Sequence, residues 1–104
     1  MLCEIKYVFL YKNGNVVLCN HKKTQIFKTI ENYNIKFIGP SLGARTLYMI
    51  DQQNNLYIYG ENNYFSGIPK YNSEPVFIDK DVLQVKEDIH GLAIIKKYGS
   101  PCNL

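Results

Sequence analysis

Short runs of β-branched and aromatic residues, separated by polar turns, recur from one end of this sequence to the other. No segment longer than about ten residues has a clear helical pattern. Predicted strands cover residues 7–12, 16–20, 34–41, 46–51, 56–60, 74–79, 81–87 and 91–99. In the segment 24–33, Ile26, Phe27 and Ile30 have helical spacing among β-branched residues, so helix and strand both stay open there. We therefore expect an all-β fold of antiparallel hairpins.

Two hairpins are the best defined local units. The segments 7–12 and 16–20 flank the turn "NGN", in which Gly14 supplies the positive φ that primed hairpin turns require. The segments 46–51 and 56–60 flank the polar turn "QQNN" at 52–55. Each turn joins two short apolar strands, so we expect both pairs to be antiparallel.

The length of 104 residues and the composition fit one small globular domain over residues 1–104. Nine Tyr and five Phe without a Trp favour strands, because aromatic residues suit a half-buried pleated surface. No charge run, proline-rich linker or low-complexity segment divides the chain.

The order of these segments repeats along the chain. "YVFLYKNGNVVLCN" aligns with "LYMIDQQNNLYIYG", so that Val8 falls on Tyr48 and Gly14 on Asn54, a shift of 40 residues. "GLAIIKKYG" then starts the pattern a third time. A period of roughly 40–50 residues with several strands in each copy is typical of propeller blades. We place a weaker copy at 7–45 and a clearer one at 46–95.

The clearer copy resembles the repeat of the regulator-of-chromosome-condensation family. The matching residues are Leu56, Tyr57, Ile58, Tyr59, Gly60 and Asn62, followed by Pro75, Val76, Val82, Val85 and Gly91. Three features depart from the family pattern. Tyr59 stands in place of the usual Trp, Phe65-Ser66-Gly67 replaces a tighter glycine loop, and His90 precedes Gly91 instead of following it.

The resemblance implies propeller-like blades and makes Gly60-Glu61-Asn62 a turn at a blade edge. A closed propeller of this kind needs about seven blades, whereas this chain supplies about two. The resemblance therefore implies that this chain forms an incomplete propeller or a small open β-sandwich. Open terminal strands present unpaired backbone groups, so we expect association by edge pairing, including with further copies, or by docking on something larger.

The cysteines and the N-terminus indicate a reducing compartment. Cys3, Cys19 and Cys102 are an odd number at wide spacing, unlike a secreted disulfide framework. The longest N-terminal apolar run, 7–11, is too short for a signal peptide or a membrane span. We expect the cytoplasm, with the nucleus as the alternative, and no membrane.

Candidate zinc ligands and a Cys/His nucleophile pair come from Cys19 and His21, with Cys3 and Cys102 as further thiols. Their spacing matches no established zinc ligand pair, and no nucleophile elbow accompanies them. Ordinary buried thiols are the simpler interpretation.

Four carboxylates at 79–88 are a second candidate site for acid–base chemistry or cation binding: Asp79, Asp81, Glu87 and Asp88. Carboxylates beside a short strand are more often solvated edge residues that discourage aggregation. The loop "GPSLGAR" at 39–45 lacks the spacing of a phosphate-binding loop. We expect no enzyme activity, no metal and no cofactor.

The net charge of +3 is unevenly distributed. Residues 1–50 carry seven Lys and Arg against two acids, and residues 51–104 carry five against seven. Five basic residues near tyrosines could follow a nucleic-acid backbone: Lys22, Lys23, Lys28, Lys36 and Arg45. Eleven of the twelve basic residues are Lys, which counts against a dedicated phosphate reader. Solvated surface lysines are the simpler interpretation.

We therefore expect a non-catalytic protein-interaction module that docks on a larger partner or assembly. Its predicted contact residues are Tyr57, Tyr59, Tyr64 and Phe65, because rigid aromatic side chains give large contact area at low entropic cost. The alternative is a small basic protein that binds RNA or a ribonucleoprotein such as the ribosome through its lysine-rich N-terminal half.

Overall fold

A computed structural model describes residues 4–20, 25–39 and 41–98 and shows strands throughout. The strands are β1 (Tyr7–Leu10), β2 (Val16–Cys19), β3 (Ile26–Ile30), β4 (Ile35–Gly39), β5 (Thr46–Asp51), β6 (Leu56–Glu61), β7 (Tyr71–Asp79), β8 (Val82–Asp88) and β9 (Gly91–Lys96). The described residues contain no helix, so the all-β prediction is confirmed. The ambiguous segment 24–33 contains strand β3.

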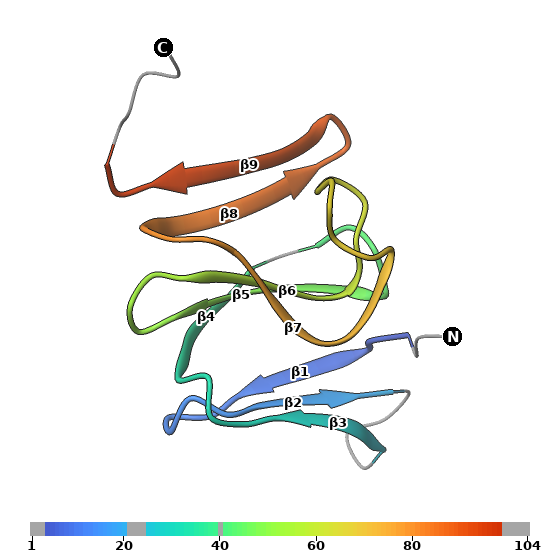
Figure 1. The fold of residues 1–104 in the computed structure, drawn as a ribbon. Coiled ribbons are helices and arrows are strands. Elements are labelled where there is room, and N and C mark those ends of the chain that lie inside the picture. Colours follow the sequence, from blue (N-terminus) through green and yellow to red (C-terminus); the bar gives the residue numbers. More distant parts are fainter. Residues whose placement is uncertain (1–3, 21–24, 40, 99–104) are drawn as a thin grey trace.

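The strands form three antiparallel sheets, none of which closes into a ring (Figure 1). The first sheet has the order β1-β2-β3, the middle sheet β4-β5-β6-β7, and the last sheet β8-β9. Both predicted hairpins are present, as β1–β2 and β5–β6. The arrangement is consistent with an incomplete propeller or a small open β-sandwich.

Two hydrophobic cores join the three sheets. The first core contains Val16, Leu18, Ile30, Ile35, Leu47, Met49 and Tyr59. The second core contains Tyr48, Ile50, Leu56, Ile58, Val82 and Val85. The middle sheet contributes to both, so it lies between the other two sheets. Each fully buried aliphatic side chain contributes about 1.5–3 kcal/mol, which makes these cores the main source of stability.

Strand β5 is buried along its whole length because its alternate side chains enter different cores. Leu47 and Met49 belong to the first core, and Tyr48 and Ile50 to the second. A strand covered on both sides carries apolar residues at consecutive positions rather than at every second one. The run "LYMI" is therefore explained by its central place.

The two hairpins have the same register after a shift of 40 residues. Val8 pairs with Leu18 in the first, and Tyr48 pairs with Ile58 in the second. The equivalent turn residues Gly14 and Asn54 both have positive φ, +90° and +65°. The predicted positive φ of Gly14 is thus confirmed, and the internal similarity of the two hairpins extends to their backbone.

The predicted turn at Gly60-Glu61-Asn62 is wrong at its first two residues. Both belong to β6, and a shift in the β6–β7 register falls between Ile58 and Gly60. Gly60 has a φ of +93°, so the strand bends there before the chain leaves it at Asn62.

Within the described residues, no helix is long and apolar enough to cross a membrane.

Candidate functional site

Two of the four predicted contact residues pack into the interior. Tyr59 is 5% exposed and is part of the first core. Phe65, which stands where the resembled family has a glycine loop, is half-buried against the second core. Tyr59 offers no surface for a partner, and Phe65 offers only part of its ring.

Tyr57 is half-buried in a short stack of aromatic rings. It makes edge-to-face contacts with Tyr33 at 5.2 Å and with Phe77 at 6.1 Å between ring centroids. Its hydroxyl donates to Asp51 Oδ2 at 3.3 Å. Burial, together with the neighbouring carboxylate, raises the pKa of Tyr57. These contacts hold the ring against the middle sheet.

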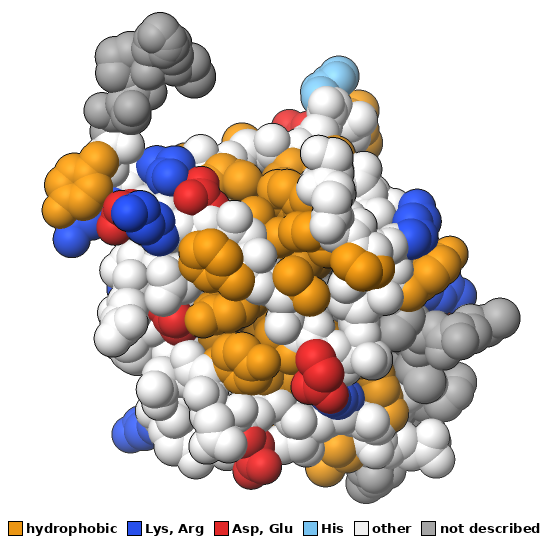
Figure 2. All heavy atoms as spheres, in the orientation of Figure 1, with side chains coloured by type: hydrophobic (Ala, Val, Ile, Leu, Met, Phe, Trp, Pro, Cys, Tyr) orange, Lys and Arg blue, Asp and Glu red, His pale blue; other side chains and the backbone are white. Residues whose placement is uncertain are grey.

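The four aromatic residues therefore do not form one patch. Tyr57 lies near the start of β6, whereas Tyr64 lies beyond its end, and a strand of this length spans roughly 15–20 Å. Figure 2 shows a band of hydrophobic side chains across the middle of one face.

Tyr64 is the predicted contact residue that projects from the surface. Its side chain is 43% exposed, and its hydroxyl donates to Glu87 Oε2 at 2.7 Å. This hydrogen bond raises the pKa of Tyr64 above its ordinary value. The phenol therefore stays neutral and bound to the carboxylate, which fixes the direction of an exposed ring.

Glu87 connects three segments that are distant in the sequence. Its Oε1 accepts hydrogen bonds from the Ser41 hydroxyl at 3.0 Å and from the Leu42 amide at 2.9 Å, while Oε2 accepts from Tyr64. Partial burial opposes ionisation, but these hydrogen bonds outweigh it and hold the pKa of Glu87 below its ordinary value. The carboxylate is thus an ionised cross-link between the 41–45 and 62–70 connections and strand β8.

Asn62 gives the 62–70 connection a fixed shape from inside. Its side-chain amide donates to the carbonyls of Phe65 at 2.7 Å and Ile68 at 2.9 Å, and its Oδ1 accepts from the amides of Tyr64 and Phe65. Asn62 is 7% exposed. A buried amide with all these partners holds the loop in a single conformation.

The connections β4–β5, β6–β7 and β8–β9 emerge on the same side of the molecule (Figure 1). We name residues 41–45, 62–70 and 89–90 the loop face. It exposes large apolar side chains: Leu42 is 60% exposed, Tyr64 43% and Ile89 84%. Apolar side chains on tethered loops at one end of a β scaffold are typical of a recognition surface.

The proposed RNA-binding residues do not converge. Lys28 forms an ion pair with Glu74 at 2.6 Å, and Lys36 donates to Asn54 Oδ1 at 3.1 Å. Lys36 lies beside the last residues of β5, while Arg45 precedes its first residue. Lys22 and Lys23 lie outside the described residues. The described basic residues therefore sit at separate places around the molecule.

The candidate catalytic and metal-binding groups are also dispersed. The described residues contain no group of three or more His, Cys, Asp or Glu side chains placed to hold a metal ion. Cys19 is buried in β2, while Cys3, His21 and Cys102 lie outside the described residues. Among the four predicted carboxylates, Asp79 forms an ion pair with Lys96, and Glu87 accepts a hydrogen bond from Tyr64 in the loop face.

The sequence predicts Glu87 as one of four candidate carboxylates but does not predict its contacts with Ser41, Leu42 and Tyr64, although its position in β8 carries a signal for them. Glu87 pairs with Leu92, and two residues earlier Val85 pairs with Ile94, so all four share one side of the last sheet. Val85 lies in the second core, with Leu92 and Ile94 packed against it. A carboxylate at an inward-facing position needs polar partners, and this requirement marks Glu87.

Comparisons with protein-family models, with curated proteins and with solved structures found no match to this chain.

Proposed function

We propose that this chain is a non-catalytic protein-interaction module that docks on a larger partner or assembly through the loop face. One observation carries the proposal: Glu87 binds Ser41, Leu42 and Tyr64 together, so exposed apolar side chains from separate connections have fixed positions.

Such an arrangement lowers the cost of binding. An interface that orders mobile loops loses about 0.5–1.5 kcal/mol for each side chain that it immobilises. Tyr64 is held before a partner arrives, and a tyrosine ring contributes contact area as well as a polar edge. Leu42 and Ile89 supply apolar surface around it. The partner surface that fits is therefore an apolar pocket with a polar rim.

The resemblance to regulator-of-chromosome-condensation repeats supports a related proposal, that the sheets are blade-like units. The shared hairpin register after a shift of 40 residues favours it. Loops at one end of stacked blades are a common place for partner binding on β folds. The proposal of a docking module does not depend on this relationship.

The mass of the native assembly tests the proposal. Tagged protein recovered from its source cells should elute well above the 12.1 kDa of one chain, at low and at high salt. The double variant Leu42→Ser/Tyr64→Ser should lose the partner. The control Tyr11→Ser, a residue 51% exposed beside the β1–β2 turn, should keep it.

Two results would count against docking through the loop face. The first is an assembly that the double variant and the control retain equally. The second is an assembly that contains RNA and dissociates steeply as salt rises, since release of counterions from phosphates has that signature. The second result would favour the RNA-binding alternative.

A further inference from the structure

Strand β9 has an open edge that no described residue covers. The last sheet contains only β8 and β9, so β9 has a partner on one side and none on the other. Figure 1 shows β9 as the outermost strand, with β8 between it and the middle sheet. The contacts to β4 and β5 are made by β8. A strand added beside β9 would therefore extend the last sheet away from the rest of the molecule.

The other edge strands carry features that discourage pairing. Strand β1 has only four residues, and the remaining edges carry Lys28 in β3, Lys36 in β4, Glu74 and Pro75 in β7, and Lys86 in β8. Strand β9 has neither a proline nor a charge from Gly91 to Ile95. The register shift in the β8–β9 pair lies between Val82 and Gln84, so the extra residue is in β8 and β9 stays regular. This edge is regular, apolar and unprotected.

The backbone groups of β9 that point to the open edge follow from its contact with β8. The Lys97 amide donates to the Asp81 carbonyl at 2.7 Å, on the β8 side. Successive residues of a strand direct their backbone groups to opposite edges. The amides and carbonyls of Leu92, Ile94 and Lys96 therefore face outward and have no strand partner among residues 4–20, 25–39 and 41–98.

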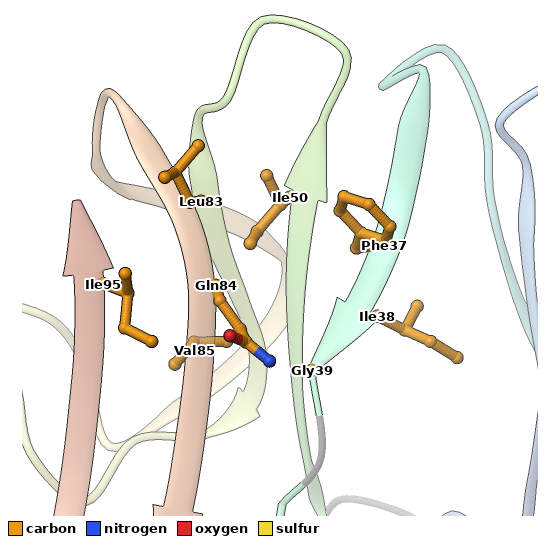
Figure 3. A pocket seen from close by; sticks show the side chains of 8 residues that line it. All are labelled: Phe37, Ile38, Gly39, Ile50, Leu83, Gln84, Val85 and Ile95. Carbon is orange, nitrogen blue, oxygen red and sulfur yellow. The ribbon is translucent and has the colours of Figure 1, made fainter. Parts of the chain in front are cut away.

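Apolar surface borders the open edge on both sides of the last sheet. Leu92 and Ile94 pack against the second core and stay partly exposed. On the other side, Ile95 is 42% exposed. It lines one end of a cavity of about 300 Å³ that extends over β8 to Phe37 on β4 (Figure 3). A neighbouring strand with apolar residues would continue both surfaces.

The charges along this edge select the occupant. Asp88 lies at the turn end of the hairpin, and Lys97 lies at its other end. A second β9 running antiparallel would bring its Lys97 beside Asp88 of the first copy, and its Asp88 beside Lys97 of the first copy. We propose that two copies of this chain associate through β9, about a two-fold axis perpendicular to the last sheet.

One register satisfies backbone and side chains together. With Ala93 opposite the partner's Ala93, Leu92 lies opposite the partner's Ile94, and both direct their backbone groups to the shared edge. Residues opposite each other share a face of the sheet, so these apolar side chains meet on the core side. The result is a four-stranded antiparallel sheet, β8-β9-β9-β8, with Lys97 beside the partner's 88–90 turn.

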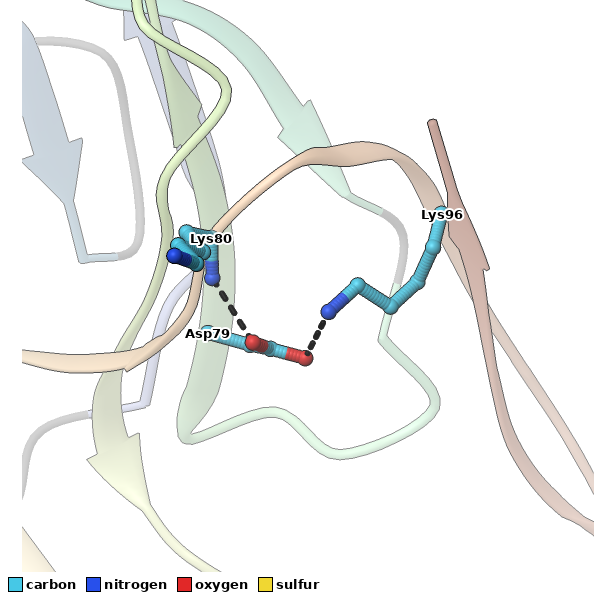
Figure 4. Close-up of polar contacts among 3 residues, drawn as sticks. All are labelled: Asp79, Lys80 and Lys96. Atoms are coloured by element: carbon cyan, nitrogen blue, oxygen red, sulfur yellow. Dashed lines mark hydrogen bonds and ion pairs between the residues drawn. The ribbon is translucent and has the colours of Figure 1, made fainter. Parts of the chain in front are cut away.

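The lysine end of β9 is anchored within its own chain. Lys96 Nζ bonds to Asp79 Oδ2 at 2.9 Å, and the Lys80 amide donates to Asp79 Oδ1 at 2.8 Å (Figure 4). The hydrogen bond from Lys96 lowers the pKa of Asp79. Lys96 is thereby occupied, and Lys97 is the cation for the partner's Asp88. The charges of Lys97 and Asp88 can therefore be reversed by substitution without disturbing the contact between Lys96 and Asp79.

A charge exchange tests the dimer by analytical ultracentrifugation. Wild-type protein should sediment with twice the 12.1 kDa of one chain. Lys97→Glu and Asp88→Lys should each be monomeric at the same concentration, because each places like charges together twice. An equimolar mixture of the two variants should recover the dimer, since every such pair in a mixed dimer is then of opposite sign.

Hydrogen exchange provides a second measurement on unmodified protein. The amides of Leu92 and Ile94 should become more protected as protein concentration rises, while those of β3 should not change. A wild-type monomer at every concentration would overturn the proposal, as would single variants that stay dimeric. Tyr64→Ser should leave the dimer intact, so failure of the loop-face proposal is distinguishable from failure of this one.

Discussion

Gly60 occupies the point where β6 meets the loop face, and replacing it with alanine tests this junction. Its φ is +93°, a conformation that residues with a side chain rarely adopt. The Glu61 amide donates to the Arg45 carbonyl at 2.9 Å, which brings that carbonyl against Gly60. A Cβ at position 60 would overlap the Arg45 carbonyl oxygen and stand 3.1 Å from its carbon.

The expected loss of stability has two parts. Left-handed backbone costs an alanine about 1–2 kcal/mol. Overlap with a backbone atom, which cannot rotate away like a side chain, adds about 1–3 kcal/mol. Alanine also lowers the conformational entropy of the unfolded chain, which offsets about 0.4–1 kcal/mol of this loss. We expect Gly60→Ala to lower the free energy of unfolding by about 2–4 kcal/mol, a large fraction of the stability of a small domain.

Gly67→Ala is the matched control. Gly67 also has positive φ, +81°, but no described atom lies within 4 Å of the position that its Cβ would take. Only the backbone cost applies, so we expect a loss of about 1 kcal/mol or less after the entropic return. Urea unfolding followed by far-ultraviolet circular dichroism measures both variants. Equal losses in the two would refute the close approach of Arg45 to Gly60.

Three further predictions concern the polar groups behind the loop face. The lowered pKa of Glu87 means that its contribution is present above the unfolded pKa, about 4.3, and is lost as pH falls through the folded pKa. The difference in urea midpoint between wild type and Glu87→Ala should therefore shrink from pH 6 to pH 3, and an equal difference at both pH values would contradict this. Asn62→Ala should cost about 2 kcal/mol, because it leaves the partly buried carbonyls of Phe65 and Ile68 without this donor, and it should speed amide exchange at 63–69; unchanged exchange would contradict this. The buried Tyr48 hydroxyl has no hydrogen-bond partner among the described residues, so Tyr48→Phe should be neutral or up to about 1 kcal/mol stabilising in the same urea assay, and a clear loss would reveal a partner.

The strands were predictable because each depends on local pattern. Short apolar runs separated by polar turns marked both hairpins, and Gly14 marked its turn. Strand β3 stayed ambiguous because β-branched residues at helical spacing favour neither state until β2 pairs with them. The resemblance to the family repeat assigned Gly60 and Glu61 to a turn, although the strand predicted at 56–60 already included Gly60. Here the glycine bends a strand that continues past it.

The site was harder to predict because it depends on contacts between distant segments. Tyr64 was identified from its aromatic character, but Tyr59 has the same character and is buried, since it faces the first core. The sequence shows which side chains of a strand share a face, but whether that face is buried depends on where the neighbouring sheet packs. Glu87 joins Ser41 and Tyr64 across separations of 46 and 23 residues, and no local pattern encodes that meeting.

Crosslinking from position 64 tests the central claim most directly. A photoreactive phenylalanine derivative in place of Tyr64 should, in the source cells, give a discrete adduct with one protein partner. The β1–β2 turn lies on the other side of the molecule from the loop face (Figure 1), and the same derivative at the similarly exposed Tyr11 beside this turn should not give the adduct. No adduct at position 64, or an equal adduct from both positions, would contradict the assignment of the loop face as the docking surface.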